Sequence, residues 1–212
     1  FVVRSEQVNA FAIPGGYIGL NAGLINLTSS EAQLAGVVAH EISHVKLRHS
    51  AEMIANMSLN NIPMWAGIIA GIFAGNAEAS MAALRLGIGQ SSQMSINLIR
   101  ENEIEADDYG IEIMTRSNYD LEEMSNFFKT MGNVSGEIQR ELSYLSTHPM
   151  YENRISHIQN KAKLQNNPIQ NSTEDYFFIK TILEVDAISD INYSLKNISS
   201  NSVINKYKKS LL

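Results

Sequence analysis

The chain has 212 residues, of which 44% are hydrophobic, and its 16 basic and 22 acidic residues give a formal net charge of −6. This length and composition allow one sizeable core, or a core with a small appendage, and show no cluster of Lys and Arg that would indicate nucleic-acid binding. The absence of cysteine excludes a disulfide framework and thiol catalysis.

The segment before Thr28 is expected to form a small sheet. Residues 2–3 and 8–12 are short extended runs, Pro14-Gly15-Gly16 indicates a turn, and an apolar run resumes over 17–20. Residues 8–12 are either an ordinary edge strand or an edge to which an extended substrate adds as a further strand. The chain begins Phe1-Val2-Val3, so we expect a fragment or mature piece whose targeting segment is not visible.

A helix is predicted to begin at the sequence Thr28-Ser29-Ser30-Glu31, which fits a capping box with Thr28 as N-cap. Within it, His40-Glu41-Ile42-Ser43-His44 is an H-E-x-x-H motif. His40 and His44 lie about one turn apart on one helix face, so both imidazoles can bind one metal ion. Glu41 lies beside them and can polarise a bound water, the geometry of zinc metallopeptidases. The alternative is a surface helix in which two histidines coincide by chance.

A third metal ligand is expected in the acidic segment 100–110. Glu103 and Asp107 are four residues apart and share a helix face. Glu103 could complete a His/His/Glu ligand set, and Asp107 could accept the ring N–H of a ligand histidine. The spacing leaves Glu101 and Glu105 as other possible ligands, and the whole run could be a solvated acidic face.

The region between these motifs has no charged residue from Met53 to Ala77. Its apolar centre, 62–75, is shorter than the roughly 20 residues that span a bilayer. Gly67, Gly71 and Gly75 make a smooth helix stripe that permits close packing. We expect a packed helix pair, a cover over the active site, or a surface that contacts membrane or a membrane-protein client. A transmembrane pair is the less favoured option.

The C-terminal part is expected to begin after residue 164. We divide the chain into a metallopeptidase domain at 1–164 and a linker with a helical appendage at 165–212. Within the first of these, a helix is predicted to begin after Asp120, which is its expected N-cap. Helices over 174–187 and 203–212 could form a hairpin. This appendage could be the start of a repeat region, although the sequence shows no convincing tetratricopeptide repeat signature.

His148 precedes Pro149 and is therefore expected in a loop. It could be a structural loop residue, a latch that fills the open zinc position, or a donor to the oxyanion of the tetrahedral intermediate. Arg154 could anchor this loop on a carboxylate, or be a solvated helix charge.

These motifs carry a family resemblance. H-E-x-x-H at 40–44, followed by E-x-x-x-D at Glu103 and Asp107, resembles the gluzincin zinc metallopeptidases, which include the HtpX-like and CAAX prenyl proteases. The segments 8–16, 146–154 and 172–176 are similar to the periplasmic branch of the family, the beta-barrel assembly-enhancing proteases. The resemblance covers the chain from about Val8 to Tyr176.

The resemblance implies one Zn²⁺ per chain, bound by His40, His44 and Glu103, with Glu41 as the catalytic base. Asp107 matches an acid that is sometimes described as a proton donor in the family, although we favour its role in orienting a histidine. His148 matches a regulatory zinc contact, which supports the latch.

We therefore expect an α+β, mainly helical zincin-like metalloendopeptidase with a small N-terminal sheet and a C-terminal helical appendage. Glu41 would assist the attack of zinc-bound water on peptide bonds. The resemblance implies unfolded or stalled envelope and outer-membrane proteins as substrates, and a periplasmic or envelope location in a bacterium. Contact with membrane or with outer-membrane assembly machinery through 62–89 is a further expectation. The alternatives are a membrane-associated HtpX-like quality-control protease and a latched chaperone or assembly adaptor with little proteolysis.

Overall fold

The computed structural model describes residues 1–13, 15–55, 93–133, 144–150, 152–166, 172–186 and 203–211. The apolar region between the two motifs, including the contact expected through 62–89, lies largely outside these residues, and its predictions are untested. Among the described helices, none is both long enough and apolar enough to cross a membrane.

The N-terminal segment forms the expected small sheet. Strands β1 (Val2–Val3), β2 (Ala10–Ile13) and β3 (Tyr17–Asn21) lie in the order β1-β3-β2. β1 runs parallel to β3, and β2 runs antiparallel to it. Gly15 and Gly16, in the turn between β2 and β3, have φ values of 100° and 85°, a region that side chains disfavour. In this sheet β2 is an edge strand.

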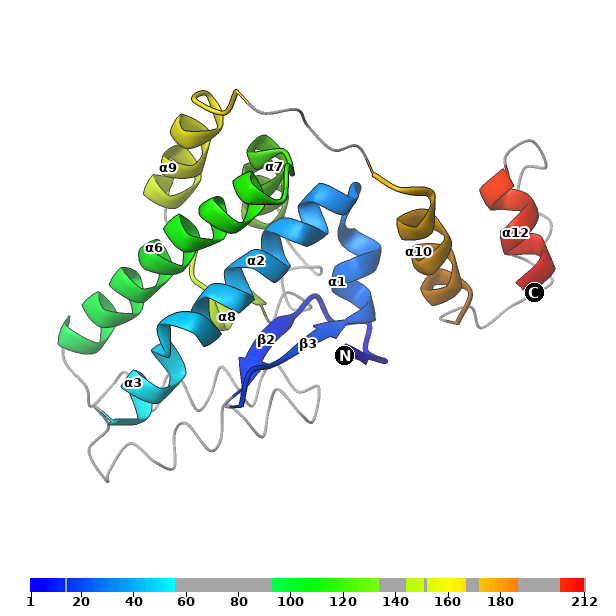
Figure 1. Cartoon of the computed structure of the whole chain (residues 1–212). Coiled ribbons are helices and arrows are strands. Elements are labelled where there is room, and N and C mark those ends of the chain that lie inside the picture. The colour runs from blue at the N-terminus through cyan, green and yellow to red at the C-terminus, as the bar shows by residue number, and fades with distance from the viewer. Residues whose placement is uncertain are drawn as a thin grey trace.

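The rest of the described chain is mainly helical, which confirms the predicted α+β class (Figure 1). The helices are α1 (Ala22–Leu27), α2 (Glu31–Leu47), α3 (His49–Ala55), α6 (Gln93–Arg116), α7 (Leu121–Asn133), α8 (Tyr144–Thr147), α9 (Glu152–Ala162), α10 (Glu174–Asp186) and α12 (Val203–Leu211).

Helix α2 begins two residues later than the predicted cap requires. Its N-cap is Ser30, whose side chain accepts a hydrogen bond from the Gln33 backbone N–H at 3.2 Å, while Gln33 Oε1 accepts from Ser29 N at 2.8 Å. Thr28 instead ends α1, where its N–H donates to Leu24 O. The predicted capping box of Thr28 with Glu31 was wrong. The hydroxyls of Thr28 and Ser30 can both cap a helix, but Thr28 belongs to the end of α1, so Ser30 caps α2.

Helix α2 runs through the middle of the fold, with α6 along one side and the sheet on the other (Figure 1). The buried stripe of α6 contains Glu103, Ala106, Asp107 and Gly110, a helical spacing that turns one face toward α2. A side chain at Gly110 would meet the backbone of His40 at 3.4 Å. This spacing is an ordinary van der Waals contact, and it shows that α6 lies directly against the metal-binding segment of α2.

The core lies where α2, α6, α7 and α9 meet. Helix α7 contributes Met124, Phe127, Phe128 and Met131, all fully buried, and α9 contributes Ile158. The start of α7 is capped as predicted, because Asp120 Oδ1 accepts from the Glu122 backbone N–H at 2.8 Å. Burial of such a set of large apolar side chains stabilises the fold and fixes the helices that carry the site.

The two predicted C-terminal helices are present as α10 and α12, and they contact each other. The rings of Phe178 and Tyr207 pack edge to face with centroids 4.8 Å apart. Helix α10 contacts α1, because Tyr176 Oη donates to the Thr28 carbonyl at 3.0 Å. The division of the chain at residue 164 stays a prediction.

Candidate metal centre

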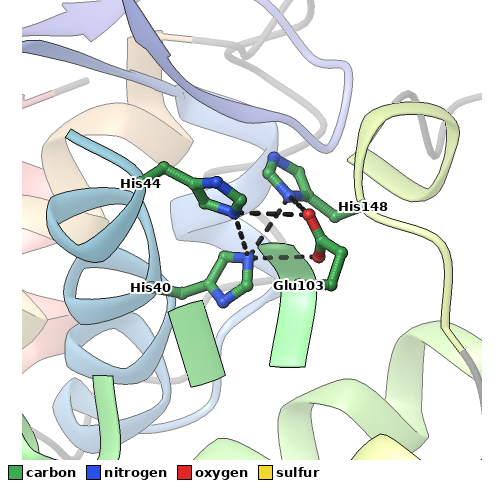
Figure 2. A group of neighbouring side chains, drawn as sticks. All are labelled: His40, His44, Glu103 and His148. Carbon is green, nitrogen blue, oxygen red and sulfur yellow. Dashed lines mark hydrogen bonds and ion pairs between the residues drawn. The ribbon is translucent and has the colours of Figure 1, made fainter. Parts of the chain in front are cut away.

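Four potential ligand side chains converge between α2, α6 and the end of α8. Figure 2 shows the side chains of His40, His44, Glu103 and His148 pointing toward one another. One ligand atom from each of the four lies within 4.8 Å of the others. His40 and His44 come from α2, Glu103 from α6, and His148 from the residue after α8. Helix geometry therefore supplies the histidine pair, while the tertiary fold brings the other two side chains to it.

The distances between the donor atoms fit a small tetrahedral ion. His40 Nε2 lies 3.0 Å from His44 Nε2 and 3.2 Å from His148 Nδ1. Glu103 Oε1 lies 3.0 Å from His148 Nδ1 and 3.3 Å from His44 Nε2. Zinc–ligand bonds of about 2.0–2.1 Å give tetrahedral edges of about 3.3 Å, and imidazole with carboxylate is a donor set that zinc accepts. The residues present therefore fit Zn²⁺.

The electrostatics of the cluster favour a cation. Burial opposes a charge on His40, but the carboxylates of Glu103 and Asp107 raise its pKa to about 9. Burial lowers the pKa of His44 to about 4. Burial also opposes ionisation of Glu103, yet the positive groups around it, including Arg154, hold the pKa of this carboxyl well below its usual range. A metal cation would take the place of the proton on His40, because ligand imidazoles must be neutral.

Glu41 lies next to this cluster and is almost completely buried. Its Oε1 is 3.3 Å from His148 Nε2. Within the described part of the chain, neither carboxylate oxygen accepts a hydrogen bond. A buried carboxylate without such a bond lowers the stability of the fold. Groups with this cost are typical of catalytic sites.

Asp107 lies behind the cluster. Its Oδ1 is 2.9 Å from His40 Nδ1, the ring nitrogen that faces away from the ligand atoms. The approach is poorly directed for a hydrogen bond, since His40 Nδ1 has no aligned partner among the described residues. The distance nevertheless places a negative charge where it can hold the His40 ring, the position that we predicted for Asp107.

Arg154, at the start of α9, contacts the carboxylates of both Glu103 and Asp107 on α6. It is 1% exposed, and its Nε and Nη2 donate to Asp107 at 2.7 and 2.8 Å. Its Nη1 lies 2.7 Å from Glu103 Oε2 and donates to the Pro149 carbonyl at 2.9 Å. Of the two alternatives raised from the sequence, the structure supports the loop anchor, because this guanidinium is buried and hydrogen-bonded.

The position of His148 depends on residues that the sequence did not single out. Its backbone N–H donates to the Tyr144 carbonyl at 2.8 Å, and its ring stacks on the Tyr144 ring with centroids 4.5 Å apart. Tyr144 is in turn tied to the N-terminal segment, since its N–H donates to the Val8 carbonyl at 3.1 Å. No local pattern marked Tyr144, because its role comes from contacts between distant segments.

The other candidate carboxylates of α6 lie away from the ligand atoms. Glu101 is exposed, and the side chain of Glu105 is 62% exposed and contacts His49 at 3.3 Å. No pattern in the sequence singled out His49 either. It is buried, and its Nδ1 lies 3.0 Å from His44 Nδ1. The fold thus brings Glu103 alone of the three glutamates to the histidine pair.

Comparison with known proteins agrees with this centre. The model of Peptidase family M48 matches residues 1–162. The chain belongs to peptidase family M48. This membership confirms the gluzincin resemblance drawn from the two motifs, and the M48 match includes all four residues of the cluster.

The M48 relatives include bacterial and mitochondrial proteins. The beta-barrel assembly-enhancing protease of Escherichia coli O157:H7 is 34% identical over 182 residues, which cover 85% of this chain and 37% of that protein. The protein of the same name from Yersinia pestis is also 34% identical over 182 residues, covering 85% of this chain and 37% of its own length. The mitochondrial metalloendopeptidase OMA1 of Schizosaccharomyces pombe is 29% identical over 164 residues, covering 74% and 44% of the two chains. The chain thus matches less than half of each relative's length.

Proposed function

We propose that this chain is a zinc-dependent metalloendopeptidase domain that hydrolyses peptide bonds. The observation that carries the proposal is the convergence of His40, His44 and Glu103 on one point. Beside it lies the carboxylate of Glu41, which accepts no hydrogen bond from a described residue. Membership of peptidase family M48 supports the same chemistry. His40, His44 and Glu103 would hold one zinc ion per chain.

A zinc ion held there would supply Lewis acidity, which polarises the scissile carbonyl and makes water more acidic. Glu41 takes the proton of the attacking water and passes it to the leaving amine. Its burial and its freedom from hydrogen bonds with described residues keep the carboxylate available for this proton. Asp107 holds the ring of His40, and Arg154 holds Asp107 and Glu103 in place.

His148 supports a resting state in which the site is restrained. Its Nδ1 lies among the ligand atoms, and its Nε2 lies beside Glu41. With zinc held by the other three side chains, His148 would take the position that a catalytic site keeps for water or substrate. The same observation supports the second candidate function, a latched chaperone or assembly adaptor with little proteolysis.

We propose unfolded or stalled envelope proteins, including outer-membrane proteins, as the substrates. The bacterial relatives are named beta-barrel assembly-enhancing proteases, and this name supports the substrate class and a periplasmic or envelope location. Among the described strands β2 lies at an edge of the sheet, and an extended peptide that added there as a further strand would gain affinity with little sequence preference. An unfolded chain can adopt that extended form, whereas a folded domain cannot.

Elemental analysis combined with a peptidase assay tests the proposal. We expect about one zinc per chain in the wild type and in Glu41→Gln, with peptide hydrolysis lost in Glu41→Gln because Glu41 is a base and not a ligand. His44→Ala and Glu103→Ala should release the metal. Full zinc retention in Glu103→Ala would disprove its assignment as third ligand, and hydrolysis by Glu41→Gln at the wild-type rate would disprove the mechanism. Binding of unfolded protein that is unaffected by Glu41→Gln, with a wild type that does not cleave, would favour the adaptor.

A further inference from the structure

Four of the five histidines of the chain gather in one place, but only three of them contribute to the ligand cluster. The fourth, His49, is 2% exposed and packs edge to face on the ring of His44, with centroids 4.9 Å apart. It lies on the side of His44 that faces away from the ligand atoms. Buried polar groups are hydrogen-bonded in nearly all proteins, so the partners of His49 indicate what this residue does.

The protons along this contact can be assigned from the distances. For His44 to offer the lone pair of Nε2 to a metal, its ring proton must be on Nδ1. His44 Nδ1 lies 3.0 Å from His49 Nδ1, so His49 must accept there and carry its own proton on Nε2. His49 Nε2 lies 3.3 Å from Glu105 Oε2, and an ionised carboxylate can only accept. All the hydrogen bonds therefore run in one direction, from His44 toward Glu105.

The backbone is shaped to make this contact. In an unbroken helix, residues five apart point about 140° away from each other, so residue 49 could not reach residue 44. Helix α2 instead ends at Leu47, and Arg48 takes the left-handed conformation with φ 63° and ψ 27°. Helix α3 then starts at His49 and turns its side chain back toward His44. A non-glycine residue in this conformation is uncommon and is kept where the surroundings require it.

We propose that His49 and Glu105 form a positioning relay that fixes His44 with Nε2 toward the metal site and links a surface carboxylate to zinc affinity. The relay rests on the proposed zinc site. Asp107 holds His40 directly, whereas His44 is held through a second imidazole. The charge of Glu105, whose side chain is 62% exposed, makes His44 a more basic ligand through His49. Neither residue touches substrate in this scheme, so both are positioning residues.

Zinc affinity measured by chelator competition on the full 212-residue chain tests the relay. His49→Phe keeps a ring but removes the acceptor, and we expect it to weaken zinc binding by about 10–100-fold. His49→Asn keeps an acceptor near the position of Nδ1 and should weaken it less. Glu105→Gln should weaken binding several-fold relative to Glu101→Gln, which removes the same charge from an exposed position one turn away on α6. Wild-type affinity in His49→Phe, or equal affinities in the two glutamine variants, would overturn the relay.

Nitrogen NMR of the imidazoles in the wild-type chain gives a second readout that does not depend on how the variants fold. The relay requires a neutral His49 that carries its proton on Nε2, with and without zinc. With zinc bound, a proton on Nδ1 of His49 would leave two N–H groups facing each other. In the zinc-free protein it would make His49 the donor and leave the proton of His44 on Nε2, and either result would overturn the proposal. Failure of the wild type to bind zinc would overturn the proposed function instead, and the His49 tautomer in the zinc-free protein would still decide the relay.

Discussion

Arg154 donates from two nitrogens of its guanidinium to the two carboxylate oxygens of Asp107, at 2.7 and 2.8 Å. The same guanidinium contacts Glu103, one helix turn earlier on α6. A charge-assisted pair in this forked geometry is among the stronger polar contacts of proteins, and here both partners are buried. It connects α9 to the face of α6 that supplies the site.

Arg154→Gln should destabilise the protein by about 3–5 kcal/mol, because it removes the guanidinium that neutralises the buried charge of Asp107. The measurement is the free energy of unfolding in urea. Arg116→Gln is the matched control, since Arg116 forms an exposed pair with Glu112 on α6, and it should cost no more than about 0.5 kcal/mol. Equal losses in the two variants would show that the Arg154 pair is no stronger than a surface pair.

Asp107→Asn should weaken zinc binding by roughly 10–100-fold, because the carboxylate next to His40 Nδ1 is replaced by a neutral amide. Competition with a chelator measures this affinity. Since Arg154 also loses its charged partner, we expect reduced stability as well. Asp108→Asn, which alters the exposed neighbour paired with His157, is the control. Unchanged affinity and activity in Asp107→Asn would leave Asp107 with a structural role only.

His148→Ala should raise the basal cleavage of an unfolded substrate while zinc stays bound by the other three ligands. The reason is that His148 Nδ1 lies 3.2 Å from His40 Nε2 and fills one position around the ligand cluster. The assay compares hydrolysis rates and zinc content. Loss of activity with zinc and fold retained would instead make His148 a donor to the oxyanion. If neither activity nor metal changes, His148 is a structural residue.

Arg48→Gly should preserve the bend between α2 and α3 and raise the free energy of unfolding by up to about 1 kcal/mol, because glycine adopts positive φ without steric cost. Arg48→Val should destabilise the protein, since a β-branched side chain is disfavoured there. Zinc affinity should be unchanged in Arg48→Gly and lowered in Arg48→Val, where the bend that carries His49 is strained. Equal stability of the two variants would contradict the left-handed assignment.

Stability should fall with acidification partly through Glu31. Burial opposes ionisation of Glu31, but hydrogen bonds from Thr173 and Tyr119 lower the pKa of this carboxyl below its ordinary value of 4.5. A depressed pKa in the folded state contributes stability above pH 4.5, and this contribution is lost as the pH falls through the lowered value. The difference in unfolding free energy between wild type and Glu31→Gln should therefore shrink below about pH 4.5. The exposed Glu122→Gln is the control, and a difference independent of pH would contradict the prediction.

The sequence alone determined the local features of this protein. The spacing of His40 and His44 depends only on helix periodicity, and Glu103 and Asp107 follow the same rule on α6. The short strands, the glycine turn and the cap at Asp120 are likewise set by residues close in the chain. The start of α2 was placed wrongly because the hydroxyls of Thr28 and Ser30, two residues apart, are equivalent helix caps as far as the sequence shows.

The tertiary structure decided which distant residues complete the site. The choice of Glu103 over Glu101 and Glu105 follows from the face of α6 that packs on α2, which spacing within one helix cannot reveal. The burial of Arg154 follows from the docking of α9, more than forty residues after the carboxylates that it binds. The contact of His49 with His44 depends on a single left-handed residue, Arg48, whose side chain gives no local signal for that conformation. Each of these contacts depends on how the helices pack against one another and cannot be derived from local sequence patterns.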